Sequence, residues 1–172
     1  MDDAFCLQFR AGSSSARCQD LRESKAVPES IEFAQQLAAL PWRRGTGGTI
    51  EVLMVTSRIS RHWLIPKGWP IADKSPGESA RQEAYEEAGI LGVLSRNPLG
   101  NYNYLKRLKD GSSIACTVAV YGLEVRELLD TWPEKKQRER RWFKPQDAAT
   151  AVVETGLAQF LETVPEVLAH LA

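Results

Sequence analysis

Residues 68–90 read GWPIADKSPGESARQEAYEEAGI, and the last nine of them, QEAYEEAGI, crowd three glutamates onto one face of a helix. Glu83, Glu86 and Glu87 are spaced i, i+3 and i+4, so like charges there cost about 0.2–0.5 kcal/mol per pair. They also lie in the last turn, where the helix dipole disfavours anions. A solvated acidic face is one explanation. The other is a hard divalent cation such as Mg²⁺, which takes carboxylate oxygens as ligands and would offset both costs.

The sequence marks both ends of this helix. Ser75-Pro76-Gly77-Glu78 has the S-x-x-E form of a capping box, with proline at the first helical position. Gly89 provides a residue that tolerates the left-handed conformation at the C-terminal end. We therefore predict a helix over residues 76–88. It carries a stripe of small residues that would let it lie close against a sheet: Gly77, Ala80, Ala84 and Ala88.

Length and composition indicate one globular domain without a global charge. The chain has 172 residues, and Lys+Arg and Asp+Glu both number 22, so no overall field favours nucleic acid or an anionic membrane. The three cysteines lack the spacing of a zinc site or a disulfide framework, which favours a reducing compartment. The first residues, MDDAFCLQFR, are acidic and mixed in character, so we expect no signal peptide there, and no apolar run has spanning length. We expect a cytoplasmic protein without a membrane partner.

Apolar and polar runs predict the remaining organisation. Residues 1–30 are polar and Ser-rich, so we expect a flexible or loosely docked N-terminal arm ahead of one domain over residues 31–172. Apolar runs predict these strands: 36–44, 50–57 and 62–66. Asp110-Gly111 predicts a hairpin turn between two further strands, residues 99–108 and 113–125.

The C-terminal part adds one strand and helical spacing. RERRWF, residues 138–143, alternates charge with aromatic residues, and as a strand it would place Arg138, Arg140 and Trp142 on one face. Beyond it, Leu, Val and Phe recur at helical spacing, with a break or kink expected near Pro165. Strands mixed with two or three helices on one core indicate an α/β sandwich.

The region around the acidic helix resembles the signature of the Nudix family, G-x5-E-x7-REUxEExGU, in which U is an aliphatic residue. Small, apolar Ala84 stands at the first U, and six positions match: Gly68, Glu83, Glu86, Glu87, Gly89 and Ile90. The resemblance implies an α/β/α sandwich with a mixed sheet. It also implies that the three glutamates and the carbonyl of Gly68 bind Mg²⁺ or Mn²⁺, and that one glutamate activates the attacking water.

Two positions depart from the family signature. Lys74 stands where the family has glutamate, and Gln82 stands where it has arginine. In the family these two residues typically pair and brace the loop against the helix. Because both have changed here, neither leaves an unpaired charge behind, and we interpret them as a replaced brace beside an intact set of metal ligands. Lys74 could instead reduce the number of bound cations or contact a phosphate.

The resemblance implies a metal-dependent pyrophosphohydrolase acting on a small phosphoanhydride substrate. The order of segments after the helix resembles the Nudix branch that cleaves diadenosine polyphosphates and diphosphoinositol polyphosphates. These segments are LGNYNYLKR, a strand, an acidic-aromatic stretch and RERRWF. Trp69 could stack on a base or merely cover its loop. Five basic residues are candidates for binding substrate, although each could equally be a solvent-facing charge: Arg43, Lys67, Lys74, Arg138 and Arg140.

Two other functions remain open at this point. A Nudix-fold binding or regulatory module that has lost turnover would explain the changes at Lys74 and Gln82. An RNA 5′-end hydrolase is disfavoured, because the chain has zero net charge and no long basic stripe with interleaved aromatic residues. The sequence does not indicate an oligomeric state.

Overall fold

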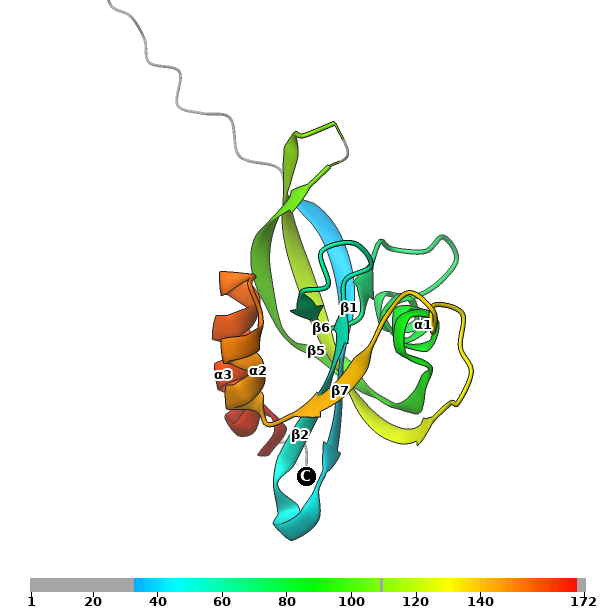
Figure 1. The fold of residues 1–172 in the computed structure, drawn as a ribbon, viewed down its shortest axis with the longest axis vertical. Coiled ribbons are helices and arrows are strands. Elements are labelled where there is room, and N and C mark those ends of the chain that lie inside the picture. Colours follow the sequence, from blue (N-terminus) through cyan, green and yellow to red (C-terminus); the bar gives the residue numbers. More distant parts are fainter. Residues whose placement is uncertain (1–32, 109, 170–172) are drawn as a thin grey trace, which may run out of the picture. The chain divides into compact units, whose positions relative to one another are not determined.

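The computed structural model describes residues 33–108 and 110–169 (Figure 1), so the arm predicted over residues 1–30 lies outside the described residues. A mixed seven-stranded sheet forms its middle layer. β1 and β6 are parallel and the other pairs antiparallel. The main path of the sheet runs through β3 (Trp63–Leu64), β2 (Ile50–Thr56), β1 (Ala34–Arg44), β6 (Ser113–Leu128) and β5 (Ile90–Arg107). Two short strands extend it: β4 (Lys67–Gly68) pairs with β1, and β7 (Arg140–Phe143) pairs with β2.

Helices cover both faces of this sheet (Figure 1). One face packs against α1 (Pro76–Ala88), and the other against α2 (Pro145–Ala151) and α3 (Thr155–Ala169). β1 is buried on both sides, because Leu37 and Ala39 join the α1 cluster while Ala38 and Leu40 join the α3 cluster. The predicted α/β/α sandwich is therefore confirmed. No described helix is both long and apolar enough to cross a lipid bilayer.

The ends of α1 are those that the sequence predicts. Ser75 Oγ accepts a hydrogen bond from the Glu78 backbone N–H, and the Glu78 carboxylate accepts one from the Ser75 N–H at 2.9 Å. Gly89 ends the helix with φ +63°, and a Cβ at that position would lie 2.9 Å from Trp132. Ala80, Ala84 and Ala88 are fully buried, so the backbone of α1 comes close to the sheet. The carboxylates at its end are thus held at a fixed height above β1 and β4.

Among the predicted strands, β5 differs most from its expected bounds, and β7 also begins later than expected. β5 begins at Ile90, directly after α1, and not at residue 99. The sequence hid this because Pro98 argues against a strand, but β5 is an edge strand with register shifts around Pro98, where proline is tolerated. β7 begins at Arg140, so Arg138 precedes the strand. Arg138, Arg140 and Trp142 nevertheless all contact α1 or its apolar cluster, so they lie on one side of the sheet, which agrees with the predicted shared face.

The break in the C-terminal helical region lies at residues 152–154. Of the predicted break or kink near Pro165, the break is wrong, because α3 runs through that residue. Val152 is extended, with φ −87° and ψ 151°, and forms a bridge with Trp63 of β3. α3 continues through Pro165 because Val164 and Leu168 on either side of it are fully buried in the core. Tertiary packing therefore outweighs the backbone hydrogen bond that proline cannot donate.

The capping box makes a prediction for stability. We expect Ser75→Ala to lower the free energy of unfolding by about 1 kcal/mol, because the Glu78 N–H would lose its acceptor. Ser75→Gly should cost only a few tenths of a kcal/mol, since glycine is itself a favourable capping residue. Urea unfolding of both variants measures the difference. Equal losses for alanine and glycine would contradict the capping role.

Candidate active site

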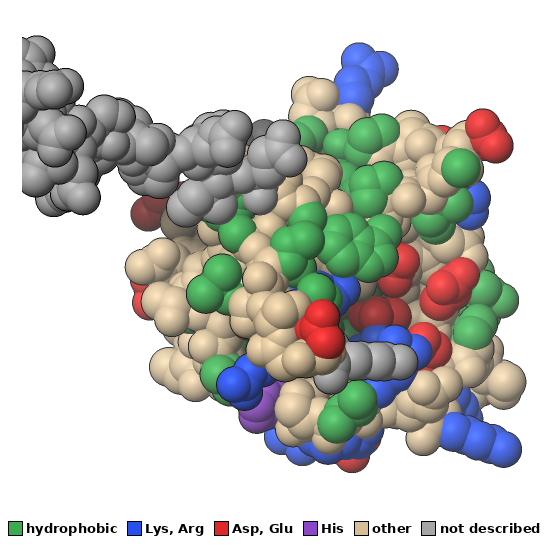
Figure 2. All heavy atoms as spheres, turned by 90° about the horizontal axis from the view of Figure 1, so that it is seen from above, with side chains coloured by type: hydrophobic (Ala, Val, Ile, Leu, Met, Phe, Trp, Pro, Cys, Tyr) green, Lys and Arg blue, Asp and Glu red, His purple; other side chains and the backbone are tan. Residues whose placement is uncertain are grey.

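A cleft of about 570 Å³ lies at the C-terminal end of α1, and we call it the anion cleft. Its lining includes one acidic residue, Glu87, and several Ser, Gln and apolar side chains. Five cationic side chains also line it: Arg58, Lys67, Lys106, Arg107 and Arg138. Figure 2 shows acidic and basic side chains mixed around a hollow on one face of the molecule. A chain with zero net charge thus concentrates positive charge in one place, next to the acidic end of α1.

Glu87 lies at the base of this cleft and is only 7% exposed. Its Oε1 accepts a hydrogen bond from Arg138 Nη2, while its Oε2 is buried without a hydrogen-bond partner. Burial raises the pKa of Glu87 to about 7, and the attraction of Arg138 offsets only part of that effect. A half-satisfied, buried carboxylate of this kind favours any cation that can reach its second oxygen.

Arg138 is held by three groups, and this explains why it is only 9% exposed. Besides Glu87, it donates to Glu134 Oε2 at 2.6 Å and to the Thr56 carbonyl at 2.9 Å. The Glu134 N–H in turn donates to the Glu86 carbonyl at 3.0 Å, which ties the segment before β7 to the end of α1. No periodic or motif signal in the sequence marks Glu134, one of two glutamates among the basic residues of WPEKKQRERR.

Glu83 lies directly against the backbone of Gly68. A Cβ added to Gly68 would lie 1.9 Å from Glu83 Oε1, so a residue with a side chain does not fit there without displacing the carboxylate. Burial raises the pKa of Glu83, and the nearby carboxylates of Glu86 and Glu134 raise it further. The structure therefore brings together Gly68 and Glu83, as the resemblance implied.

The two residues that depart from the family signature contact each other. Lys74 Nζ donates to Gln82 Oε1 at 2.9 Å, and Gln82 Nε2 donates to Glu86 Oε1 at 2.6 Å. These two hydrogen bonds support the interpretation of a replaced brace. They also extend the brace to Glu86, one of the three glutamates of the acidic helix. Lys74 lies outside the lining of the anion cleft.

Lys67 reaches the cleft, as predicted. It is nearly buried, donates to Glu154 Oε1 at 2.9 Å and lies with Nζ 4.6 Å from the centre of the Tyr104 ring. The sequence missed Glu154, because a single acid between two helical segments resembles any solvent-facing charge. Trp69 is partly exposed, and Lys106 Nζ lies 4.3 Å from its ring centre.

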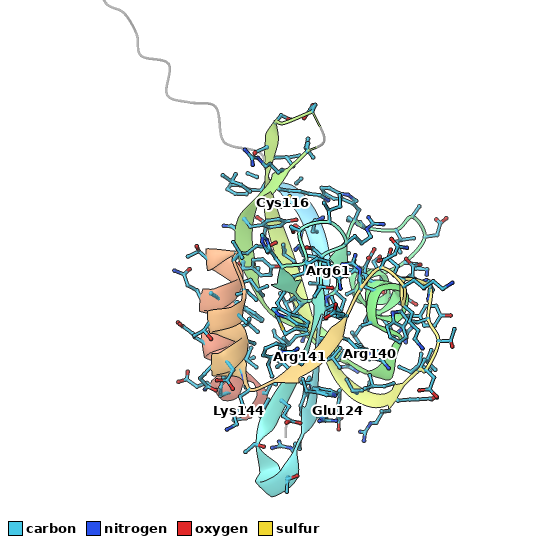
Figure 3. All side chains as sticks on the ribbon, in the orientation of Figure 1. Arg61, Cys116, Glu124, Arg140, Arg141 and Lys144 are labelled. Atoms are coloured by element: carbon cyan, nitrogen blue, oxygen red, sulfur yellow. The ribbon has the colours of Figure 1, made fainter. Side chains whose placement is uncertain are left out.

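Arg43 and Arg140 do not line the anion cleft, contrary to the prediction. Arg43 pairs with Glu51 at 2.7 Å and stacks on Trp142, and it lies six residues along β1 from Leu37, the partner of Gly68. That spacing corresponds to about 20 Å. Arg140 donates to the carbonyls of Ala88 and Leu129 and lies on the α1 side of β7 (Figure 3). The guanidinium groups of Arg43 and Arg140 thus contact structural partners outside the anion cleft.

The donor set fits a hard divalent cation. Within residues 33–108 and 110–169, no group of three or more His, Cys, Asp and Glu side chains is already arranged to hold a metal ion. The reason is visible in the contacts: Glu86 is bonded to Gln82 and Glu87 to Arg138. Yet the free Oε2 of Glu87 and the carboxylate of Glu83 against Gly68 supply the oxygen ligands that Mg²⁺ and Mn²⁺ prefer. Glu87 could therefore offer Oε2 to a metal ion while its Oε1 still accepts from Arg138.

Comparison with known proteins gives one family. The chain matches the model of the NUDIX domain over residues 35–164. It is 36% identical to Nudix hydrolase 16, mitochondrial, of Arabidopsis thaliana over 83% of this chain and 79% of that protein. It is 39% identical to diphosphoinositol polyphosphate phosphohydrolase 3-beta of Homo sapiens over 57% of each chain.

A solved structure shows the same fold. The Ap4A hydrolase of C. elegans in a binary complex matches with a TM-score of 0.62 and 19% identity, over 80% of this chain and 99% of that one. The chain spans about half the length of some relatives, including 50% of one protein of Arabidopsis thaliana. Because the NUDIX model covers well over half of the sequence and the acidic helix lies where that family has its signature, this protein belongs to the Nudix family.

Proposed function

We propose that this protein hydrolyses a pyrophosphate bond in a small phosphoanhydride substrate with the help of Mg²⁺ or Mn²⁺. The observation that carries the proposal is the position of Glu87. Its buried, half-satisfied carboxylate lies at the base of a cleft lined by five Lys and Arg side chains. A metal ion needs the carboxylate, and a polyphosphate needs the surrounding positive charge. The names of the relatives, which include hydrolases of phosphoanhydrides, agree with this activity.

The roles follow from the contacts. Glu83, Glu86 and Glu87, with the carbonyl of Gly68, would hold the metal ion, which when bound neutralises phosphate charge and lowers the pKa of coordinated water. Lys67 is held in the cleft by Glu154 and would bind a phosphate oxygen. Arg138 becomes available for the same purpose when it releases Glu87, since it keeps Glu134 as a partner. Arg43, Lys74 and Arg140 have no part in this proposal.

The compartment stays a prediction. The cysteine pattern favours a reducing environment such as the cytoplasm. Imaging of the tagged full-length protein in its own cells would decide the location.

Replacing Glu87 tests the proposed chemistry. We expect the wild-type protein with Mg²⁺ or Mn²⁺ to release product from at least one member of a panel of diadenosine polyphosphates, a diphosphoinositol polyphosphate, ADP-ribose and nucleoside triphosphates. Glu87→Gln should lower kcat by roughly 10²–10⁴-fold, because the metal would lose a charged ligand. Glu166→Gln, on the exposed side of α3, is the matched control and should behave as wild type. Binding of a panel member without product, equal in wild type and Glu87→Gln, would favour the binding module instead.

Gly68 offers a second test of the metal site. We expect Gly68→Ala to weaken Mn²⁺ binding and lower activity together, because the new methyl group would push Glu83 out of its place. Isothermal titration calorimetry with Mn²⁺ alone measures the affinity, and circular dichroism checks that the variant folds. A folded Gly68→Ala with unchanged Mn²⁺ affinity would separate Glu83 from the metal site.

The raised pKa of Glu87 predicts how stability depends on pH. The folded, metal-free protein holds a proton on Glu87 up to about pH 7, whereas the unfolded chain loses it near 4.5. This contribution to stability is therefore fully present below the unfolded value and is lost as the pH rises through about 7. In a chelator, we expect the free energy of unfolding to fall between about pH 5 and about pH 8, by up to a few kcal/mol.

Urea unfolding at the two pH values measures this loss. It should be smaller in Glu87→Gln, which has no proton to lose. Mg²⁺ should restore stability in the wild type at the higher pH, where Glu87 is ionised and can bind it. A wild-type protein that becomes more stable over this range in chelator would contradict the assignment.

A further inference from the structure

The segment between β2 and β3, residues 57–62, lines part of the anion cleft, and we call it the β2–β3 loop. Backbone hydrogen bonds fix its base. The Ser57 N–H donates to the His62 carbonyl at 2.8 Å, and the Thr56 N–H donates to the Glu139 carbonyl at 3.0 Å. Four consecutive residues of the loop line the cleft: Ser57, Arg58, Ile59 and Ser60. The position of the loop therefore decides where the guanidinium of Arg58 meets the cleft.

Arg61, in the same loop, has a backbone conformation that arginine rarely adopts. Its φ is +59°, in the left-handed region that glycine and asparagine tolerate best. A residue with a long side chain keeps such a conformation only where the surrounding contacts fix it, and residues of this kind cluster at ligand-binding sites. The reason for this conformation must therefore lie in what the Arg61 side chain contacts.

The guanidinium of Arg61 ties the loop to residues 133–139, the segment that leads into β7. Its Nη1 donates to the Gln137 carbonyl at 2.7 Å, and its Nη2 donates to the Glu139 carboxylate. The side chains of Arg61 and Glu139 are 43% and 66% exposed, and exposed ion pairs contribute little to stability. Stability alone therefore does not explain the tie. Its other effect is to fix the β2–β3 loop against a segment that carries two groups of the site, Glu134 and Arg138.

Arg58 is the cleft residue that this tie would position. Its Nη1 lies 3.5 Å from Glu134 Oε1, and its side chain is 59% exposed. Its charge also acts on the acidic end of α1: burial raises the pKa of Glu83, and the attraction of Arg58 opposes that shift. A cation with one long, exposed contact can exchange it for a phosphate oxygen at little cost. Arg58 is thus placed at the cleft but only weakly bound there.

We propose that Arg61 is a positioning residue, which holds the β2–β3 loop against the segment before β7 so that Arg58 can bind a phosphate of the substrate. This inference rests on the proposed function. Arg61 does not itself line the anion cleft, so it acts through Arg58 and not on the substrate. Because the loop is already fixed when the substrate arrives, binding loses less loop and side-chain freedom.

Arg61→Gly separates positioning from stability. Glycine adopts the left-handed conformation without strain, so the melting temperature should stay close to that of the wild type while the tie is lost. Using the full-length protein with Mg²⁺, kcat and KM are measured for diadenosine tetraphosphate and for a diphosphoinositol pentakisphosphate. We expect KM to rise about tenfold and kcat to stay within about twofold, because Arg58 binds phosphate equally in the ground state and the transition state. Arg61→Lys should give an intermediate KM, since an ammonium does not reproduce the two-pronged geometry of a guanidinium.

A double-mutant cycle tests whether Arg61 acts through Arg58. Arg58→Gln alone should raise KM by about tenfold. Adding Arg61→Gly to Arg58→Gln should then raise KM by less than about twofold further, because no guanidinium is left to position. An effect of Arg61 that does not pass through Arg58 would instead give the same rise in both backgrounds.

Two further variants complete the design. Arg126 on β6 forms a comparable exposed pair with Glu124 at 2.9 Å and does not line the cleft, so Arg126→Gln is the matched control and should leave KM unchanged. Arg61→Asn also removes the tie and tolerates the left-handed conformation, so it should reproduce the KM of Arg61→Gly and takes its place if glycine loosens the loop. Circular dichroism and thermal unfolding check that each variant folds.

The outcomes distinguish the two proposals. An unchanged KM in folded Arg61→Gly and Arg61→Asn would overturn the inference and leave the proposed function standing. A rise in KM that persists in full in the Arg58→Gln background, or a loss of kcat without a change in KM, would do the same. If the wild type cleaves neither probe, the variants are measured on the panel member that it does cleave. Cleavage of no phosphoanhydride in the panel would overturn the proposed function and the inference with it.

Discussion

The buried contact between Glu87 and Arg138 joins the end of α1 to the segment that leads into β7, and the rest of the site is arranged around it. Removing one partner of such a pair leaves an uncompensated buried charge, at a cost of about 3–5 kcal/mol. Losing Glu87 would cost Arg138 less than this, because Arg138 also donates hydrogen bonds to Glu134 and to the Thr56 carbonyl. Arg138 therefore has enough partners to lose Glu87 and remain satisfied, whereas Glu87 has only Arg138. That asymmetry makes Glu87 the group that gains most from a metal ion.

Small residues make this arrangement possible. The buried alanines of α1 allow its backbone to approach the sheet, and they leave the carboxylates little freedom to move away. Gly68 then permits Glu83 to lie on the backbone of β4, and Gly89 permits Trp132 to cover the end of the helix while its indole N–H donates to the Glu87 carbonyl at 3.1 Å. Both glycines stand where a side chain would displace a group of the site. Packing and electrostatics thus constrain the same few positions.

The features that could be predicted from the sequence are those that depend on neighbours along the chain. The ends of α1 follow from Ser75 and Gly89, and the stripe of alanines follows from helical spacing. The partners of the basic residues could not be predicted, because they depend on how the strands pair. Arg43 lies far along β1 from Gly68, and Glu134 and Glu154 reach the site from segments without periodicity. Of the break or kink predicted near Pro165, the break is wrong for a related reason, since the core around Val164 and Leu168 keeps α3 continuous.

The cations of the anion cleft differ in how strongly they are already neutralised. Lys67 and Arg138 have close, buried carboxylate partners, and Arg58 has a longer, exposed contact with Glu134 at 3.5 Å that contributes little. Within the described part of the chain, Lys106 and Arg107 have no ion-pair partner, and burial lowers the pKa of Lys106. If the proposed function holds, an incoming polyphosphate would gain most at Lys106 and Arg107, which have no ion-pair partner among the described residues. At Lys67 and Arg138 it must share the cation with an internal acid, and this keeps both side chains ordered next to Glu87.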